Sequence, residues 1–359
     1  MTRPAQITID LSALQENFQH IKTLAPSSKI LAMVKSNGYG HGISRVALAL
    51  PQADAFGVAC LEEGLQLRDA GIQQSIVLME GLFAANEFPE VLKHQFSLVV
   101  HHEEQIKILE KHAGKDLISV WLKINTGMHR LGFEPHQVES IYARLMNCAI
   151  VKKPIGLMTH FAEADSLERA PTLQQITTFD QITEHLEGPK SLANSAGIIA
   201  WPSSHADWVR PGIMLYGASP FAQHRGLEHN LKPVMSFSSK LTAIHSVPGG
   251  SRVGYGGAWV CPEDMRIGVV GIGYGDGYPW HAKNGIPVLV NGRPCPLIGR
   301  VAMDMLTVDL RTQPEAKLGD PVLLWGPGLP VEVIAEQSGT SAYELLTRIT
   351  QRVHVVVKP

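Results

Sequence analysis

Eight short apolar runs alternate with helical patterns between residues 29 and 211, and this alternation limits the possible fold more than any other feature of the chain. The runs lie at 29–35, 55–60, 75–80, 96–101, 118–125, 155–160, 191–193 and 207–211. Segments between them, such as 61–68 and 103–111, carry apolar residues at three- and four-residue spacing, as amphipathic helices do. Because strands joined through helices pair in parallel, the pattern predicts a parallel (β/α)8 barrel of the TIM type.

A different pattern follows residue 226. Short β-prone runs broken by Gly and Pro recur at 235–247, 266–272, 287–290, 305–310 and 321–324, and one helical pattern lies at 343–350. The strand-like run 6–10 precedes the first helix of the barrel, and we expect it to pair with this later part. A chain of 359 residues suits two domains. The sequence therefore predicts an α/β barrel domain over 1–228 and a mainly β domain over 229–359.

Composition and charge narrow the functional classes. Hydrophobic residues make up 45% of the chain and charged residues 18%, which is typical of a globular protein with a sizeable core. The net charge of −2 gives no electrostatic reason to expect nucleic acid as a partner. The apolar runs are short and interrupted, so we expect no membrane-spanning helix. Residues 1–6 lack the apolar core of a signal peptide, and we expect a cytoplasmic protein.

The cysteines and histidines show no metal-binding pattern. Cys60, Cys148, Cys261 and Cys295 are scattered without the spacing of metal ligands, and the histidines form no HExxH pair. Cysteines of cytoplasmic proteins stay reduced. We therefore expect packing thiols rather than disulfides, and no metal site.

A glycine-rich loop follows the first apolar run. Residues 32–42 read AMVKSNGYGHG, and Lys35 stands where the strand gives way to the loop. Such a lysine is commonly a solvated strand terminus or the partner of a carboxylate. A desolvated lysine can instead condense with a carbonyl group, which makes Lys35 a candidate for a Schiff base with pyridoxal phosphate.

Other chemically active side chains stand at the ends of the later runs. They are Lys123 and Arg130 after the fifth run, His160 at the end of the sixth, Ser195 after the seventh, and Arg210 at the end of the eighth, ahead of Gly212 and Ile213. Taken singly, His160 is commonly a core histidine, Arg210 half of an ion pair, and Ser195 the cap of a helix that begins at 196 or 197. The carboxyl ends of barrel strands meet at one mouth, where barrel enzymes hold their chemistry. Their joint placement therefore predicts an active site.

Five sequence blocks, in order along the chain, carry a family resemblance. They are VKSNGYGHG (34–42), KINTGMHR (123–130), GYG (254–256), GYGDGY (273–278) and GRVAMD (299–304). With these blocks the chain resembles the alanine racemases, the fold-type III pyridoxal-phosphate enzymes, over essentially its whole length. The resemblance implies a homodimer in which Lys35 carries the cofactor and Tyr255 of the partner subunit reaches the same site. An amine and a phenol on opposite faces of the substrate would then act as two bases and interconvert L-alanine and D-alanine.

The resemblance also assigns residues to the cofactor. Tyr39, Ser195, Gly212, Ile213 and Tyr343 match positions that hold the phosphate. Arg210 matches the donor to the pyridine nitrogen, His160 lies beside the ring, and Arg130 contacts the phenolic oxygen. Lys123 matches a lysine that many relatives carry as a carbamate. Because an unmodified Lys123 beside Arg130 would be a like-charge pair, a carbamate or a nearby chloride is chemically reasonable.

The substrate side of the site follows from the same resemblance. Met303 matches a position whose backbone binds the substrate carboxylate, together with Arg130. Tyr274 and Tyr343 would narrow the entrance, while Asp165 and Arg300 would line the outer corridor. A narrow pocket favours the methyl side chain of alanine over larger ones.

This chain departs from the family pattern at two positions. Asn125 stands where relatives often have Asp, and Trp280 stands where they often have Arg. Neither position carries a predicted base, so both bear on substrate access rather than on the reaction.

Two other functions stay open at this stage. A broader-specificity amino-acid racemase would share the architecture, although such enzymes are typically secreted. A non-catalytic pyridoxal-phosphate carrier would resemble the barrel alone, so the β domain with Tyr255 and Met303 favours the enzyme. An alanine racemase would supply D-alanine for peptidoglycan or serve alanine catabolism.

Overall fold

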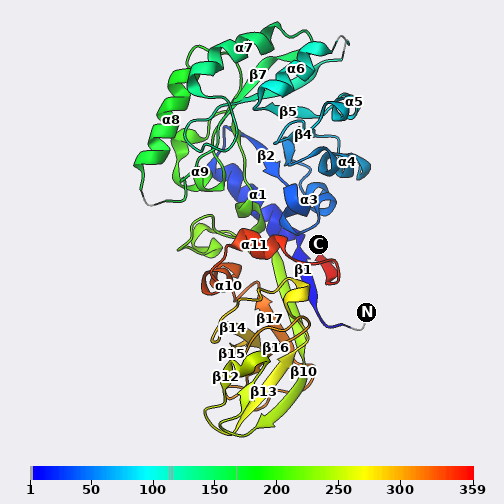
Figure 1. The fold of residues 1–359 in the computed structure, drawn as a ribbon, viewed down its shortest axis with the longest axis vertical. Helices are drawn as coiled ribbons and strands as arrows, with labels where there is room; N and C mark the ends of the chain where they lie inside the picture. The colour runs from blue at the N-terminus through cyan, green and yellow to red at the C-terminus, as the bar shows by residue number, and fades with distance from the viewer. Residues whose placement is uncertain (1–2, 113, 115, 167) are drawn as a thin grey trace. The chain divides into compact units, whose positions relative to one another are not determined.

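A computed structural model describes residues 3–112, 114, 116–166 and 168–359 of the chain (Figure 1). Its contacts divide the chain into two compact units. One unit is Phe18–Leu215, and the other combines the segment up to Asn17 with Tyr216–Pro359. We refer to them as the barrel unit and the β unit. The roles assigned to 1–228 and 229–359 stay a prediction.

The barrel unit contains eight parallel strands that close on themselves in chain order, which confirms the predicted barrel. The strands are β2 (Lys29–Met33), β3 (Ala55–Val58), β4 (Ser75–Leu78), β5 (Ser97–Val100), β6 (Ile118–Lys123), β7 (Val151–Met158), β8 (Lys190–Ser191) and β9 (Trp208–Val209). Closure comes from β9 pairing with β2, in the register Lys29 with Trp208 and Ile30 with Val209. Residues of β3 are buried throughout, as expected for a strand covered on both faces.

Helices connect the strands and lie outside the barrel (Figure 1). They are α1 (Leu11–Leu24), α3 (Ile43–Ala49), α4 (Leu61–Asp69), α5 (Phe88–Lys93), α6 (Glu103–Lys111), α7 (Val138–Asn147), α8 (Ala170–Thr183) and α9 (Ser195–Ala200). The short element α2 (Lys35–Tyr39) is a left-handed turn ahead of α3. No helix among the described residues is long and apolar enough to cross a membrane.

The β unit is built on an eight-stranded sheet in the order β13-β16-β15-β14-β17-β10-β1-β18. Its strands are β1 (Gln6–Asp10), β10 (Met235–Val247), β13 (Met265–Val270), β14 (Pro287–Val290), β15 (Arg293–Ile298), β16 (Leu306–Asp309), β17 (Pro321–Trp325) and β18 (His354–Lys358). The long β10 also pairs with β13 beyond a bulge, so the strands from β13 to β10 in this order form a closed ring, and β1 and β18 extend the sheet from β10. The first strand, β1, lies between β10 and β18.

Smaller elements of the β unit carry the candidate site residues. A two-stranded ribbon, β11 (Arg252–Val253) and β12 (Trp259–Val260), flanks the short turn η6 (Tyr255–Gly257). A second turn, η7 (Tyr274–Asp276), follows β13. The helices are α10 (Val331–Gln337) and α11 (Ala342–Thr347), so the helix expected at 343–350 ends three residues early.

Candidate active site

Lys35 begins a left-handed turn directly after β2, whose last residue is Met33. The turn α2 has φ values of 52° at Ser36, 53° at Asn37, 61° at Gly38 and 51° at Tyr39. A left-handed backbone costs an L-residue roughly 1–2 kcal/mol, so a run of this kind persists only where its surroundings hold it. The strand prediction was therefore two residues too long, because the chain leaves the sheet to build this turn.

Side chains and backbone groups around the turn hold it in place. The Ser36 and Ala59 N–H groups donate to the two carboxylate oxygens of Glu63 at 2.7 Å and 2.8 Å. The Ile43 N–H donates to Asn37 Oδ1 at 3.1 Å. The buried His41 ring bonds through Nδ1 to the Tyr39 carbonyl at 2.8 Å, and burial lowers the pKa of His41 to about 4.

Arg210 is the most enclosed cation of the barrel mouth, with 2% of its surface exposed. Its Nη1 donates to Ser191 Oγ at 2.7 Å, and its Nη2 donates to the carbonyls of Thr159 at 2.6 Å and Leu192 at 3.0 Å. Burial lowers the pKa of Arg210 to about 9, so the guanidinium stays charged at neutral pH. Neutral oxygens fix its orientation and leave its charge uncompensated.

His160 lies against this guanidinium, with 3.2 Å between its Nδ1 and Arg210 Nη2. Burial, followed by the charges of Lys123, Arg210, Arg130 and Lys35, holds the pKa of His160 well below its usual value. The imidazole is therefore neutral at neutral pH. Since the guanidinium can only donate, Nδ1 accepts and the ring proton sits on Nε2.

Lys123 ends β6 and is 9% exposed. Burial, and then the charges of Arg210, Arg130 and Lys35, lower its pKa well below the usual value for lysine. A small cavity next to it is lined by Lys123, Ile124, Asn125, Thr126, Met128, Arg130, Leu131 and His160. The structure thus brings Lys35, Lys123, Arg130, His160 and Arg210 together, as the strand-end positions predicted.

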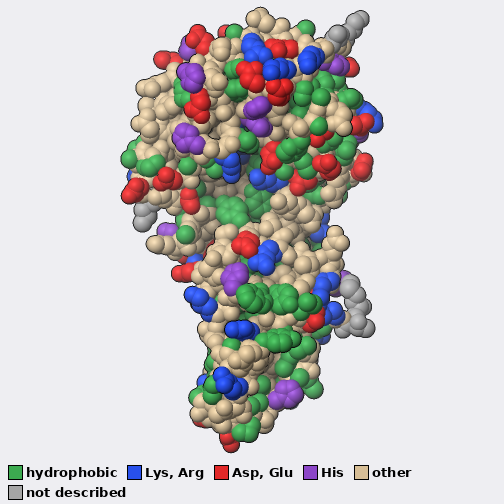
Figure 2. All heavy atoms as spheres, viewed as in Figure 1, with side chains coloured by type: hydrophobic (Ala, Val, Ile, Leu, Met, Phe, Trp, Pro, Cys, Tyr) green, Lys and Arg blue, Asp and Glu red, His purple; other side chains and the backbone are tan. Residues whose placement is uncertain are grey.

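The outer surface of the barrel unit has a different charge pattern. On the face that Figure 2 shows, Lys and Arg side chains are interspersed with Asp and Glu. At the mouth, by contrast, no carboxylate of the described residues lies within 4.0 Å of Lys35, Lys123, Arg130 or Arg210. The mouth is therefore a local concentration of positive charge that suits an anionic ligand.

Ser195 and Gly212 meet beside the Lys35 turn. The Gly212 N–H donates to Ser195 Oγ at 2.9 Å. A Cβ added to Gly212 would lie 2.5 Å from Tyr39 Oη, so the phenol and this backbone are in close contact. Burial raises the pKa of Tyr39 to about 12 and keeps the phenol protonated. Asn194, and not Ser195, caps α9, because its Oδ1 accepts the Gly197 N–H at 2.9 Å.

The remaining predicted site residues are spread over both units. Tyr255 lies in η6 with 70% of its surface exposed, Tyr274 lies in η7, and Tyr343 lies in α11. Met303 and Arg300 are exposed on the segment between β15 and β16 of the same unit. Asp165 is exposed in the barrel unit, between β7 and α8. Their roles stay predictions.

Sequence reasoning missed the residues that orient the cations. Ser191 and Thr159 bond Arg210, and Thr159 Oγ1 also contacts Thr126 Oγ1 at 2.7 Å. Gln175 Nε2 donates to Thr126 Oγ1 and to the His160 carbonyl, both at 3.1 Å. Polar residues at buried strand ends were the available signal, since such groups need partners.

The hydrogen bonds of Asn125 suit an amide better than a carboxylate. Its Nδ2 donates to Glu134 Oε1 at 2.6 Å, and its Oδ1 accepts the N–H groups of Gly127 at 3.2 Å and His129 at 2.9 Å. An aspartate could accept from those amides but would place a second carboxylate against Glu134. The amide serves as donor and acceptor at once.

A closed parallel barrel with basic side chains at the carboxyl ends of its strands, followed by a β unit, defines the class of protein: a (β/α)8-barrel enzyme fold with a positively charged mouth. The chain matches the family profile "Alanine racemase, N-terminal domain" over residues 9–220 and "Alanine racemase, C-terminal domain" over residues 234–357.

Individual relatives match along the whole chain. The chain is 52% identical to the alanine racemase of Coxiella burnetii (strain RSA 493 / Nine Mile phase I), over 98% of each protein. It is 50% identical to the biosynthetic alanine racemase of Escherichia coli (strain K12), over 97% of this chain and 98% of that one. The biosynthetic alanine racemase of Pseudomonas aeruginosa superposes with a TM-score of 0.97 at 43% identity, over 100% of both chains. The chain belongs to the alanine racemase family.

Proposed function

We propose that this protein interconverts L-alanine and D-alanine with pyridoxal 5'-phosphate, as a cytoplasmic homodimer with shared active sites. The observation that carries the proposal is the convergence of Lys35, Lys123, Arg130, His160 and Arg210 at the barrel mouth of a chain from this family. The product would supply D-alanine for peptidoglycan or enter alanine catabolism.

The residues at the mouth fit the cofactor. A phosphate dianion suits the hydroxyls of Tyr39 and Ser195 and the backbone at Gly212 and Ile213, to which Tyr343 adds a phenol. Gly212 fits this role because its backbone lies against the Tyr39 hydroxyl, where a side chain would intrude. The cations around this cradle complement the negative charge of the group. When bound, pyridoxal phosphate delocalises the charge left on the alanine Cα after its proton is removed.

Arg210 would hold the pyridine nitrogen of the cofactor. Its guanidinium stays charged at pH 7 and can only donate hydrogen bonds, so it would donate to that nitrogen and oppose its protonation. Ser191 and Thr159 fix its plane through the hydrogen bonds described above. Arg130 would contact the phenolic oxygen, and the neutral His160 would lie beside the ring.

Lys35 and Tyr255 of the partner subunit would move the proton. One base removes it from one face of the alanine Cα and the other returns a proton to the opposite face, which inverts the centre. A phenol with the usual pKa of about 10 needs help to act as a base near neutral pH. A hydrogen-bond network from Arg210 through His160 would supply that help.

Lys123 would carry a carbamate or lie beside a chloride. As a free amine it is buried among cations, and its depressed pKa favours the neutral nucleophile that reacts with carbon dioxide. The neutral amine and carbon dioxide form an N–C bond and release one proton, which leaves an anion; two protons are released in all when the lysine starts as an ammonium cation. That anion would orient Arg130.

Residues of both units would bind or select the substrate. The Met303 backbone and Arg130 would bind the alanine carboxylate, Tyr274 and Tyr343 would narrow the entrance, and Asp165 and Arg300 would line the corridor. A second copy of the chain would cover Tyr255, Trp280 and Met303, whose exposed fractions of 70%, 58% and 53% are large for apolar side chains. In this arrangement 1–228 binds the cofactor and 229–359 supplies the tyrosine to the partner.

The test is to incubate the cofactor-loaded protein with pure L-alanine and follow D-alanine by chiral chromatography, with L-serine and L-lysine in parallel. We expect alanine to reach an even mixture and lysine to react little. Comparable conversion of lysine would favour a broader-specificity racemase. No conversion of any substrate by a protein that binds the cofactor would favour a carrier.

A further inference from the structure

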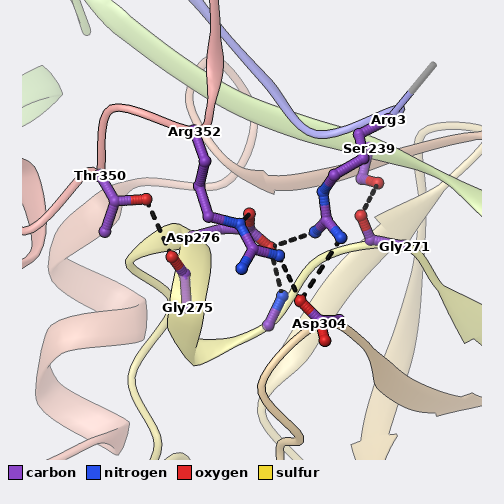
Figure 3. Close-up of polar contacts among 9 residues, drawn as sticks. Arg3, Ser239, Gly271, Gly275, Asp276, Asp304, Thr350 and Arg352 are labelled. Carbon is purple, nitrogen blue, oxygen red and sulfur yellow. Dashed lines mark hydrogen bonds and ion pairs between the residues drawn. The ribbon is translucent and has the colours of Figure 1, made fainter.

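A fully buried carboxylate anchors a charged cluster in the β unit. Asp276, in η7, has no exposed surface, and two arginines reach it from opposite ends of the chain. Arg3 Nη2 lies 2.8 Å from Asp276 Oδ2, and Arg352 Nε lies 2.8 Å from Asp276 Oδ1. The Gly273 N–H also donates to Asp276 Oδ2 at 2.9 Å. In Figure 3 the two guanidinium groups converge on this carboxylate.

Arg352 also reaches a second carboxylate. Its Nη2 bonds Asp304 Oδ1, so the guanidinium bridges Asp276 in η7 and Asp304 on the segment between β15 and β16 (Figure 3). Arg3 Nη1 lies farther from Asp304, at 3.4 Å. Arg352 is therefore the main charged link between the two segments.

Backbone hydrogen bonds tie the same two segments at Met303. The Gly275 N–H donates to the Met303 carbonyl at 2.9 Å, and the Tyr274 N–H donates to the Ala302 carbonyl at 3.0 Å. A Cβ on Gly275 would lie 3.0 Å from both Arg352 Nη1 and the Met303 carbonyl, so the packing here is tight. Thr350, two residues before Arg352, donates through Oγ1 to the Gly275 carbonyl at 2.9 Å.

The Met303 N–H differs from the carbonyl of the same residue in its hydrogen bonding. Within the described part of the chain no group accepts a hydrogen bond from it, while the carbonyl of the same residue is engaged by Gly275. Met303 is 53% exposed. Hydrogen bonds to the neighbouring turn therefore hold the segment, while the Met303 N–H keeps no hydrogen-bond partner among the described residues.

We propose that Arg352 is a positioning residue for the substrate carboxylate: by bridging Asp276 and Asp304 it fixes the Met303 amide relative to Tyr274. This inference rests on the proposed function, in which the Met303 backbone binds that carboxylate. Displacement of a binding group by about 1 Å is enough to weaken its contribution severely. Lysine cannot replace Arg352 fully, because a single ammonium lacks the planar fork that spans two carboxylates.

The test compares the Arg352→Gln and Arg352→Lys holoenzymes with a matched control, Arg311→Gln. Arg311 is also a half-exposed arginine of the β unit that bridges a buried carboxylate, Asp309, and an exposed one, Glu263. Two quantities are measured: kcat and KM for both alanine enantiomers, and the Kd of propionate, which keeps the carboxylate and the methyl carbon but has no amino group.

We expect Arg352→Gln to raise KM and the propionate Kd together, by about tenfold, with kcat within about twofold of wild type. The KM and propionate Kd of Arg352→Lys should lie between those of the wild type and those of Arg352→Gln. Arg311→Gln should lose comparable thermal stability and keep both constants. Unchanged KM and Kd in Arg352→Gln, or a loss confined to kcat, would overturn the inference.

A second variant covers the case in which Arg352→Gln does not fold. Asp304→Asn removes only the exposed end of the bridge and leaves the buried Asp276 pairs intact, and we expect a rise in KM and Kd of the same kind. Constants equal to wild type in a folded Asp304→Asn would refute the bridge. If the wild-type holoenzyme neither racemises alanine nor binds propionate, the proposed function itself fails, which is a different result.

Discussion

The contact between Gly212 and Tyr39 allows a quantitative test of the proposed phosphate-binding site. In Gly212→Ala the new methyl group would lie 2.5 Å from Tyr39 Oη, whereas ordinary van der Waals contacts begin at 3.4 Å. The hydroxyl must therefore retreat by about 0.9 Å, the difference between those two distances. The backbone at 212 has no left-handed φ, so the substitution acts through this steric conflict alone.

The displacement should cost both stability and cofactor affinity. Overpacking of a buried site costs typically about 1–3 kcal/mol of unfolding free energy. A shift of about 0.9 Å also lengthens a hydrogen bond from Tyr39 to a phosphate beyond the normal range. Hydrogen bonds to charged groups are worth roughly 1.5–3 kcal/mol, so the Kd for pyridoxal phosphate should rise by about 10- to 150-fold. Titration of the apoprotein, followed by cofactor absorbance, measures the affinity.

Tyr39→Phe supplies the control, alone and combined with Gly212→Ala. Without the hydroxyl, the nearest atom to the new methyl group is Tyr39 Cζ at 3.1 Å, so most of the conflict disappears. We expect the double variant to be more stable than Gly212→Ala and to bind cofactor as weakly as Tyr39→Phe. Additive losses in the double variant, or wild-type affinity in Gly212→Ala, would refute the steric reasoning.

Three other substitutions test separate parts of the molecule. Tyr255→Phe should abolish racemisation while cofactor absorbance and unfolding stay unchanged, because the side chain is 70% exposed; residual racemisation near the wild-type rate would remove Tyr255 from the mechanism. The pKa of His41 is about 4 in the folded state and about 6.5 in the unfolded chain, so between these pH values only the unfolded chain binds the proton. The free energy of unfolding should therefore fall by about 3 kcal/mol as the pH is lowered through this window. His41→Asn keeps a donor near the Tyr39 carbonyl and should flatten this part of the pH profile of chemical denaturation; an unchanged slope would assign the acid sensitivity elsewhere. Asn125→Asp places a carboxylate against Glu134 and should lower the free energy of unfolding by about 1 kcal/mol at pH 8 but by little at pH 4. Denaturation midpoints equal to wild type at both pH values would contradict the account of Asn125.

The barrel could be predicted because its strands are buried on both faces and leave apolar runs in the sequence. The β unit was harder, for reasons visible in single elements. Strand β15 contains Pro294 and Pro296, which lack the N–H groups of a sheet ladder and argue against a central strand. Strand β18 pairs with β1 from the other end of the chain, and helix α10 has only seven residues. Pairings and short elements of this kind depend on tertiary contacts.

Some features of the candidate site could likewise be predicted from the sequence, and others could not. Positions at strand ends predicted that Lys35, Lys123, His160 and Arg210 would lie close together, because the chain order of a barrel fixes where those ends meet. The left-handed turn after Lys35 could not be foreseen, since Ser36, Asn37 and Tyr39 adopt a backbone that their side chains disfavour. The bridge from Arg352 to Asp276 and Asp304 leaves no local pattern, because its partners are distant in sequence.

The strained turn and the concentration of positive charge lie at the same mouth. Each raises the free energy of the folded chain when no ligand is bound. Lys35, Arg130 and Arg210 are grouped around the Lys123 amine with no described carboxylate within 4.0 Å of any of them, and the turn beside them holds its backbone in a disfavoured region. An anion that binds only the folded state relieves the repulsion and stabilises the fold by mass action, by about 2.7 kcal/mol at one hundred times its Kd. The proposed ligands, pyridoxal phosphate and alanine, would bring a phosphate and a carboxylate to this mouth. The positions that destabilise the unliganded barrel are therefore the ones through which its proposed ligands would stabilise it.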